Sequence, residues 1–265
     1  MNHWIAPYLS DGLGNRLFQY SCAKQYAEEN KKQLVFFLPR CAPTNHGKFD
    51  TIFKLFPEVS IVETDVSWNE IEEPIDQHFK YFELRTNLNL PIVIRGYRQT
   101  YKYFDSAKIE PKFENIISEK RMKVLETRYL KDHMFFIHVR LGDFRILPHH
   151  QINIPKYLIM ACSKIPQNSN ILIFSDEPEL IKDLFNFPHV LCDEKDEVEV
   201  LYLMSKCTQG AIVANSTFSF WGAYLAHNNS KDFICIFPNT MGRGNDMSNI
   251  EDYIPPWADT IDASF

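Results

Sequence analysis

Arg140 shows the clearest potential for chemistry, because it ends an apolar run and is followed at once by Gly142 and Asp143. The apolar segment 135–140 has the length and composition of a buried strand in an α/β sheet. Ligands of such sheets bind outside the carboxyl ends of the strands. The guanidinium of Arg140 is therefore placed to hold an anion, since its planar donors match phosphate oxygens in pairs. The alternative is a structural ion pair between Arg140 and Asp143.

Polar residues also mark the ends of two further apolar runs. Asp176 follows the run 171–174, and Asn215, Ser216 and Thr217 follow the run 211–214. Ser216 and Thr217 are typical of a helix start, whose exposed N–H groups can hold a phosphate. Capping of the helix explains these two residues equally well. Together with His138 on the first strand, three neighbouring strand ends predict one anion-binding site.

A glycine-containing turn near the start of the chain is the fourth candidate. Residues 11–15 read DGLGN, and the segment after them has a helical period. Gly14 lets backbone approach a ligand closely, and Asn15 lies where the positive end of a helix favours an anion. The spacing is not that of a dinucleotide fingerprint, because no third glycine follows Gly14. A tight turn without a ligand is the alternative.

The elements that must position these residues alternate between short apolar runs and helical periods, which predicts an α/β fold with parallel sheets. The second half shows this most clearly, with a connecting polar helix over 113–132. The expected strands of that half are 135–140, 171–174, 189–192, 211–214 and 233–237, and the expected helices are 156–165, one from Glu179, 198–205 and one from about Phe218.

The first half begins in the same way, with a strand over 3–9, a helix carrying Phe18, and a strand over 34–38. Residues 40–90 are less regular. We therefore expect two Rossmann-like domains, 1–112 and 113–265, that face each other across a cleft lined by strand ends.

Composition excludes several classes of function. The chain has 265 residues, 45% of them hydrophobic, and a formal net charge of −6. These values indicate an ordinary globular protein and argue against a general nucleic-acid or anionic-membrane surface. No segment reaches the roughly twenty apolar residues of a membrane span. The first residues do not resemble an export signal, and the six scattered cysteines are typical of reduced thiols. We expect a cytoplasmic protein without disulfides.

Five motifs in order resemble the α-1,2-fucosyltransferases of glycosyltransferase family 11, and the resemblance spans nearly the whole chain. The most specific are the HVRLGD and NSTFSFWGA segments. The five are residues 11–20 (DGLGNRLFQY), 96–99 (GYRQ), 138–143 (HVRLGD), 174–176 (FSD) and 215–223 (NSTFSFWGA).

The resemblance implies a GT-B fold with an acceptor-side first domain and a second domain that binds the sugar nucleotide. It implies GDP-L-fucose as donor, a β-galactoside-type acceptor, inversion at the anomeric carbon and no required metal. Arg140 is expected to bind the β-phosphate, and Ser216 and Thr217 the pyrophosphate. His138 and Asp176 are expected to face the nucleoside, and Asn15 the fucose or phosphate.

The chain departs from many relatives at Leu141, where a second arginine is common, and at Arg16 and Arg98. We expect these two arginines to add positive charge near the cleft. No Asp-x-Asp element of the kind that holds a divalent ion is present. We expect Arg140 and helix N–H groups to stabilise the leaving diphosphate instead, with Asp143 orienting Arg140.

The general base is left open at this point, with Asp11, Asp143, His149 and His150 as candidates. Two other functions are also open. One is a GDP-fucose-dependent transferase with another linkage or acceptor. The other is a binding module that keeps the nucleotide pocket without turnover.

Overall fold

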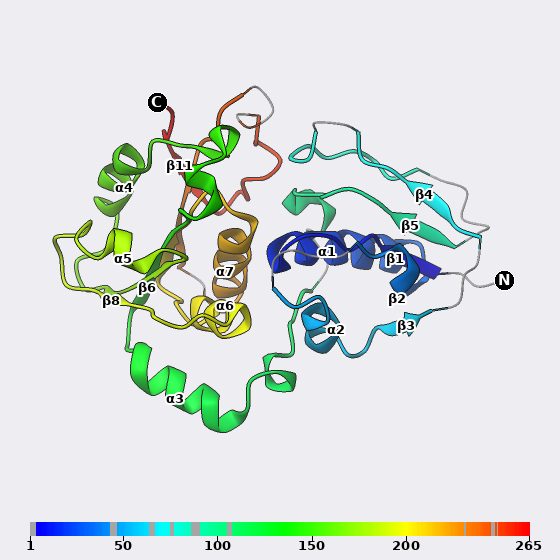
Figure 1. Cartoon of the computed structure of the whole chain (residues 1–265), viewed down its shortest axis with the longest axis horizontal. Coiled ribbons are helices and arrows are strands. Elements are labelled where there is room, and N and C mark those ends of the chain that lie inside the picture. Colours follow the sequence, from blue (N-terminus) through cyan, green and yellow to red (C-terminus); the bar gives the residue numbers. More distant parts are fainter. Residues whose placement is uncertain are drawn as a thin grey trace. The chain divides into compact units, whose positions relative to one another are not determined.

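The computed structural model describes the chain apart from residues 1–3, 43–46, 64–66, 75–76, 86–90, 105–107, 231, 245–246 and 248. The chain forms two compact units. Unit 1 comprises residues 1–116 together with 251–254, and unit 2 comprises 117–250 together with 255–265. Each unit is described by itself below, with labels as in Figure 1.

Unit 1 is built on a parallel sheet of five strands in the order β3-β2-β1-β5-β4. The central strand is β1, and all four described neighbours run in its direction. The strands are β1 (Trp4–Pro7), β2 (Gln33–Phe37), β3 (Ser60–Val62), β4 (Asn69–Ile71) and β5 (Ile92–Ile94).

The helices of unit 1 are α1 (Leu13–Glu29) and α2 (Thr51–Leu55). Helix α1 lies alongside β1 and β2 (Figure 1). The sequence had predicted a turn over residues 11–15. Gly12 is instead the N-cap of α1, so Gly14 and Asn15 belong to the first helical turn. Short 3₁₀ segments complete the unit: η1 (Leu38–Arg40), η2 (Tyr101–Tyr103) and η3 (Phe113–Asn115).

Unit 2 contains a parallel sheet of six strands in the order β11-β10-β9-β6-β7-β8. Its strands are β6 (Met134–Val139), β7 (Asn170–Ser175), β8 (Val190–Leu191), β9 (Gly210–Ile212), β10 (Ile234–Pro238) and β11 (Asp259–Ile261). Its helices are α3 (Glu119–Tyr129), α4 (Ile154–Cys162), α5 (Pro178–Ile181), α6 (Glu197–Ser205) and α7 (Thr217–His227), with 3₁₀ segments η4 (Asp143–Arg145) and η5 (Pro148–His150).

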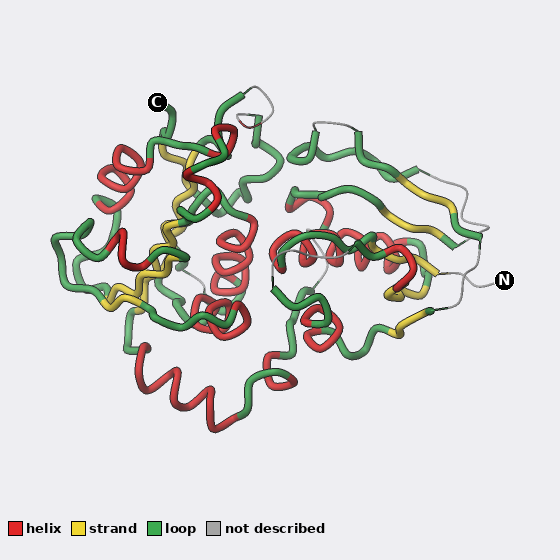
Figure 2. The backbone as a smooth tube through the Cα atoms, viewed as in Figure 1, coloured by secondary structure: helices red, strands yellow, loops and turns green. Residues whose placement is uncertain are grey.

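The sheet of unit 2 is covered on both faces, with α4 and α5 on one side and α6 and α7 on the other (Figures 1 and 2). Alternation along β6 decides which side chain meets which layer. Ile137 packs with Tyr157 and Leu158 of α4, whereas His138 contacts Phe218 of α7. Each fully buried Ile or Phe contributes roughly 1.5–3 kcal/mol to folding, so the six buried residues of β6 anchor this sheet.

The elements predicted for the second half are confirmed within about two residues at most ends, except that α5 is a single turn. The predicted strands 3–9 and 34–38 correspond to β1 and β2, with His3 outside the described residues. Strands β3, β4, β5 and β11 have three residues each, too short to show a period in sequence.

Both ends of the connecting segment 113–132 are tied to the unit in which they lie. Lys112 N donates to Leu55 O at 2.8 Å, and Asn115 Nδ2 to Lys54 O at 3.1 Å, which keeps this part with α2 of unit 1. Helix α3 is held in unit 2 by Arg121, which pairs with Glu194 and Glu199. The unit boundary accordingly falls after Ile116.

Candidate functional site

Each unit has a topological switch point at its central strand. In unit 2 the chain runs from β6 outward to β7 and β8, then returns to β9 on the other side of β6 and continues to β10 and β11. In unit 1 the same reversal places β2 and β5 on opposite sides of β1. Ligands of doubly wound sheets bind at the carboxyl ends of the two strands that flank such a reversal. Apart from His138, which lies inside β6, the predicted site residues follow strands of these two edges.

Arg140 lies at the switch point of unit 2, directly after β6, with its side chain 27% exposed. Its guanidinium pairs with two carboxylates: Nη2 is 2.6 Å from Asp143 Oδ1, and Nη1 is 2.8 Å from Asp176 Oδ2. The register explains the second contact, because Val139 pairs with Ser175 and so sets Arg140 beside Asp176. The structural ion pair between Arg140 and Asp143, one of the two roles considered for Arg140, is therefore present. Asp176 is a second carboxylate partner of the same guanidinium.

Gly142 is needed for this arrangement. A Cβ atom at Gly142 would lie 2.4 Å from Asp176 Oδ2 and 3.9 Å from Arg140 Cζ. The other oxygen of Asp176 accepts a hydrogen bond from Leu141 N at 2.8 Å. The loop after β6 therefore wraps closely around the carboxylate that holds Arg140, and only a residue without a side chain fits there unmoved.

His138 is buried on the α7 face of β6, with its ring 6.1 Å from that of Phe218. Burial, with a smaller contribution from the charge of Arg140, lowers the pKa of His138 to about 3, so the imidazole is neutral near pH 7. Its Nδ1 atom has no hydrogen-bond partner among the described residues. A buried ring nitrogen without a partner costs free energy, and a ligand hydrogen bond would offset that cost.

The segment after β9 positions the start of α7. Ser216 is the N-cap residue, but its side chain makes no capping hydrogen bond to the helix. Instead, Ser219 Oγ accepts from Ala214 N at 3.0 Å. Asn215 is buried, and its amide nitrogen donates to His150 O at 2.8 Å and Met241 O at 2.9 Å. The side chain of Ser216 therefore does not cap α7, and the amide of Asn215 links the segments that contain His150 and Met241. Thr217 opens the helix, whose first-turn N–H groups have no intrahelical acceptor.

A cavity of about 290 Å³ opens beside Arg140. Phe144 and His150 stack in it with ring centroids 4.4 Å apart, and Arg140 Cζ lies 5.3 Å from the ring of Phe144. Burial lowers the pKa of His150, with the charges of His149 and Arg140 acting in the same direction and Asp143 opposing them. The cavity combines a cation, aromatic faces and apolar walls, which is a common make-up of small-molecule sites.

The switch point of unit 1 brings together two predicted motifs. Gln99, from the loop after β5, donates from Nε2 to Asn15 Oδ1 in the first turn of α1 at 2.9 Å. The turn before α1 is held by Gln19, which bonds the backbone N–H and the hydroxyl of Ser10 at 2.9 Å each. Gly14 is buried inside the helix start.

The sequence predicted that Arg16 and Arg98 add positive charge near the cleft, but the structure uses both side chains inside unit 1. Both are almost fully buried. Arg16 Nη1 donates to Lys48 O and Phe49 O at 2.8 and 3.0 Å. The guanidinium of Arg98 donates to the carbonyls of residues 95 and 71 at 3.0 Å each. Both side chains hold loops together in the interior, because carbonyl acceptors that are buried need donors.

The candidates for a general base differ in the groups that they contact. Asp143 is paired with Arg140. The rings of His149 and His150 lie against each other at 4.2 Å. Asp11 faces Tyr97, whose pKa is raised chiefly by burial and further by the charge of Asp11 and a hydrogen bond to it. A paired Glu73 and His78, described below, were missed because β4 is too short to be recognised.

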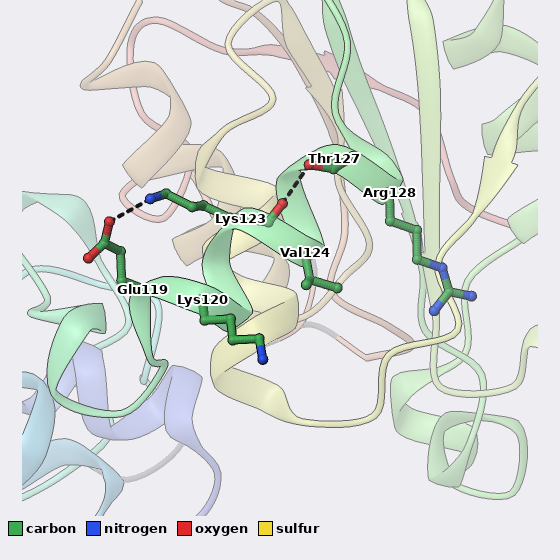
Figure 3. Close-up of a pocket in the computed structure, with 6 residues that line it drawn as sticks. All are labelled: Glu119, Lys120, Lys123, Val124, Thr127 and Arg128. Carbon is green, nitrogen blue, oxygen red and sulfur yellow. Dashed lines mark hydrogen bonds and ion pairs between the residues drawn. The ribbon is translucent and has the colours of Figure 1, made fainter.

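A second hollow lies along one face of α3 and contains none of these residues. Figure 3 shows the residues that line it. Lys123 pairs with Glu119 at 2.7 Å, and the hydroxyl of Thr127 donates a hydrogen bond to the carbonyl oxygen of Lys123. The lining is exposed charge on a single helix, so it has the character of an ordinary solvated surface.

The described part of the chain holds neither a cluster of metal-ligating side chains nor a membrane-spanning helix. No group of three or more His, Cys, Asp or Glu side chains there is placed to hold a metal ion. Within the same residues, no helix is both long and apolar enough to cross a membrane. All six cysteines are free thiols.

A sequence model described as "Glycosyl transferase family 11" matches residues 74–259. The matched segment contains the whole switch point of unit 2 and the loop after β5, and it covers more than half of the chain.

Known proteins similar to the chain are glycosyltransferases. It is 25% identical over 295 residues to the O-antigen biosynthesis glycosyltransferase WbnK of Escherichia coli, covering 91% of this chain and 96% of that protein. It is 24% identical over 267 residues to an α-1,2-colitosyltransferase of Escherichia coli, covering 83% and 87%. Among solved structures, the fucosyltransferase NodZ from Bradyrhizobium shares the fold with a TM-score of 0.54 at 14% identity, covering 85% and 92%. The predicted α/β, GT-B fold class is confirmed.

Proposed function

We propose that this chain, which belongs to glycosyltransferase family 11, transfers L-fucose from GDP-L-fucose to the 2-hydroxyl of a galactose-type acceptor with inversion. The observation that carries the proposal is Arg140, a partly exposed guanidinium at the switch point of unit 2. It is held between Asp143 and Asp176 and lines one cavity with Asn215, which lies two residues before α7.

Arg140 suits a leaving diphosphate because its present partners are carboxylates at an open site. A phosphate oxygen can replace a carboxylate oxygen with the same bidentate geometry. As the bond between the sugar and GDP breaks, negative charge builds on the β-phosphate. A guanidinium and helix N–H groups fixed around that oxygen stabilise the transition state more than the ground state.

The other predicted contacts form part of the same proposal. His138 would offer its unpartnered Nδ1 atom to the nucleoside, and the stacked Phe144 and His150 would line the donor cavity. Ser216 and Thr217 would present the helix start to the pyrophosphate. The proposed role of Asn15 near the fucose is supported by its fixed orientation, since Gln99 holds its carbonyl oxygen.

Transfer without a required metal is also proposed, because Arg140 and the α7 helix start supply the positive charge that a divalent ion would bring. The cytoplasmic location belongs to the same proposal, supported by six free thiols, which fit a reducing compartment.

A second donor is favoured by one comparison. A relative covering most of the chain is named an α-1,2-colitosyltransferase, which supports the α-1,2 linkage but points to a colitosyl group. Incubation with a panel of galactosides and either GDP-fucose or GDP-colitose, followed by linkage analysis of the product, separates the two. We expect α-1,2-linked fucose. A colitosylated product alone would replace the proposed donor.

Donor recognition is tested by thermal unfolding. A ligand at 100 times its Kd adds roughly 2.7 kcal/mol to the stability of the native state, so GDP and GDP-fucose should raise Tm. UDP-sugars should not, and equal stabilisation by UDP-galactose would contradict the proposal. Turnover should survive excess EDTA. Slow hydrolysis of GDP-fucose without acceptor distinguishes an enzyme from a binding module.

A further inference from the structure

A paired carboxylate and imidazole lie at the carboxyl edge of the unit 1 sheet, apart from the residues assigned above. Strands β4 and β5 pair with Ile71 opposite Ile94, so the residues two positions later, Glu73 and Gly96, face each other. A Cβ atom at Gly96 would lie 2.3 Å from Glu73 Cβ. Gly96 also has a φ of 110°, a backbone conformation that residues with a side chain rarely adopt. The backbone is thus shaped to receive Glu73.

Glu73 is a buried carboxylate whose oxygens are all engaged. Its side chain is 2% exposed. Oε2 accepts from Tyr97 N at 2.8 Å, Oε1 accepts from Arg98 N at 2.8 Å, and His78 Nδ1 lies 2.7 Å from Oε2. These bonds fix both the loop after β5 and the orientation of the imidazole of His78.

His78 is linked by hydrogen bonds to the GYRQ and DGLGN segments of unit 1. Its carbonyl accepts from Gln99 N at 2.9 Å, and the side chain of Gln99 bonds Asn15 in α1. Tyr97 packs perpendicular to the imidazole with centroids 4.9 Å apart. The side chain is 35% exposed, and no described residue hydrogen-bonds Nε2. Nδ1 is held inside, and Nε2 is the nitrogen that a ligand can use.

We propose that His78 is the general base of the transfer, accepting the proton of the acceptor hydroxyl on Nε2, with Glu73 as the positioning residue. A carboxylate bonded to one imidazole nitrogen fixes the tautomer and stabilises the imidazolium that forms. This inference rests on the proposed function and adds the acceptor side of it.

The step balances without a further reagent. The acceptor oxygen forms a bond to the anomeric carbon while the bond from that carbon to the GDP oxygen breaks, and its electron pair leaves on the diphosphate. The hydroxyl proton passes to Nε2 of His78 and later to solvent.

The charged and titratable groups around His78 favour this role. Glu73 faces it from the segment after β4, and Tyr97 faces it from the loop after β5. Asp11 forms a hydrogen bond with Tyr97, and the guanidinium of Arg98 donates to backbone carbonyls instead. Asp11 is the competing base at this edge, and it serves as the second arm of the test.

The experiment compares transfer, acceptor-independent hydrolysis of GDP-fucose and GDP binding in five variants. His78→Asn keeps a donor near Glu73 and removes Nε2. We expect its kcat for transfer to fall about 10²–10⁴-fold, while hydrolysis and the Kd for GDP stay within about twofold. The acid limb of the kcat/KM pH profile should disappear. Imidazole should restore part of the transfer by His78→Ala.

Two further variants serve as comparison and control. Glu73→Gln should lower transfer and shift the acid limb, which a purely structural role would not do. His189→Gln changes a histidine of unit 2 that bonds Phe187 O, and it should change nothing.

Three results would overturn the inference. They are transfer by His78→Asn within about threefold of the parent, an equal loss of hydrolysis and transfer, or a loss in Asp11→Asn that removes the acid limb while His78→Asn retains it. A parent protein that transfers neither fucose nor colitose would overturn the proposed function itself, and the inference with it.

Discussion

The switch points of the two units carry the same kind of residue in different settings. Arg140 follows the central strand of unit 2, is 27% exposed, and pairs with two carboxylates. Arg16 and Arg98 lie near the central strand of unit 1, are buried, and donate to backbone carbonyls. At an open edge, a phosphate can replace a carboxylate as the partner of an arginine, because water can then solvate the released carboxylate. Buried carbonyls cannot lose their donor without cost. The partner atoms therefore decide whether an arginine serves a ligand or the fold.

The largest effect is expected for Arg140→Ala, which should lower kcat by on the order of 10²–10³ with little change in Tm, by analogy with loss of an oxyanion donor. Arg140→Lys should restore little, because an ammonium cannot make the two-pronged contact. Both quantities are measured on one preparation. An alanine variant with lower Tm and normal kcat would assign Arg140 to the fold.

Arg98→Met should show the opposite pattern. Removing a buried charged donor from two backbone carbonyls should reduce the free energy of unfolding by about 3 kcal/mol, since hydrogen bonds to charged groups contribute about 1.5–3 kcal/mol each. Turnover per folded molecule should be unchanged. Arg95→Met is the matched control: Arg95 makes a partly exposed pair with Glu70 at 3.0 Å, which is worth about 1 kcal/mol or less. Equal losses in urea titration would remove the contrast.

The buried His138 should make stability depend on acid. Its pKa is about 3 in the folded protein, below the ordinary value of 6.5, so the unfolded chain binds the proton more readily. Its contribution is complete above pH 6.5 and is lost as pH falls from there toward 3, at about 1.4 kcal/mol per unit. His138→Gln should flatten the urea-derived stability between pH 6.5 and 5 by about 2 kcal/mol. An unchanged slope would show that the imidazole is not kept neutral by burial.

The smallest effect concerns Gly142→Ala. The new methyl group should displace Asp176 from Arg140 and weaken GDP binding about three- to tenfold, or about 1 kcal/mol, measured by calorimetry. If the substitution acts through Arg140, it should add little in an Arg140→Ala background. Additive losses in the double variant would mean that the glycine shapes the pocket independently.

Long, continuous apolar runs made most of unit 2 predictable. Strands β6 and β7 have six residues each, and the alternation with helical periods identified the doubly wound order. The three-residue strands of unit 1 carry no such signal, because a segment of that length reads the same as loop. The polar start of α7 was recognised, but its hydrogen bonding was not, since the hydroxyl of Ser219, inside the helix, is the group that accepts from Ala214 N.

The residues at the strand ends were determined by the sequence alone. The apolar run before Arg140 requires a buried strand, and a strand of a parallel sheet must deliver the next residue to the ligand edge. Which atoms meet there was decided by the tertiary structure. Asp176 is 36 positions from Arg140 and Glu73 is 24 from Tyr97, and both pairs exist because the register of neighbouring strands sets their ends side by side. Register depends on the packing of whole strands, which no local pattern of residues contains.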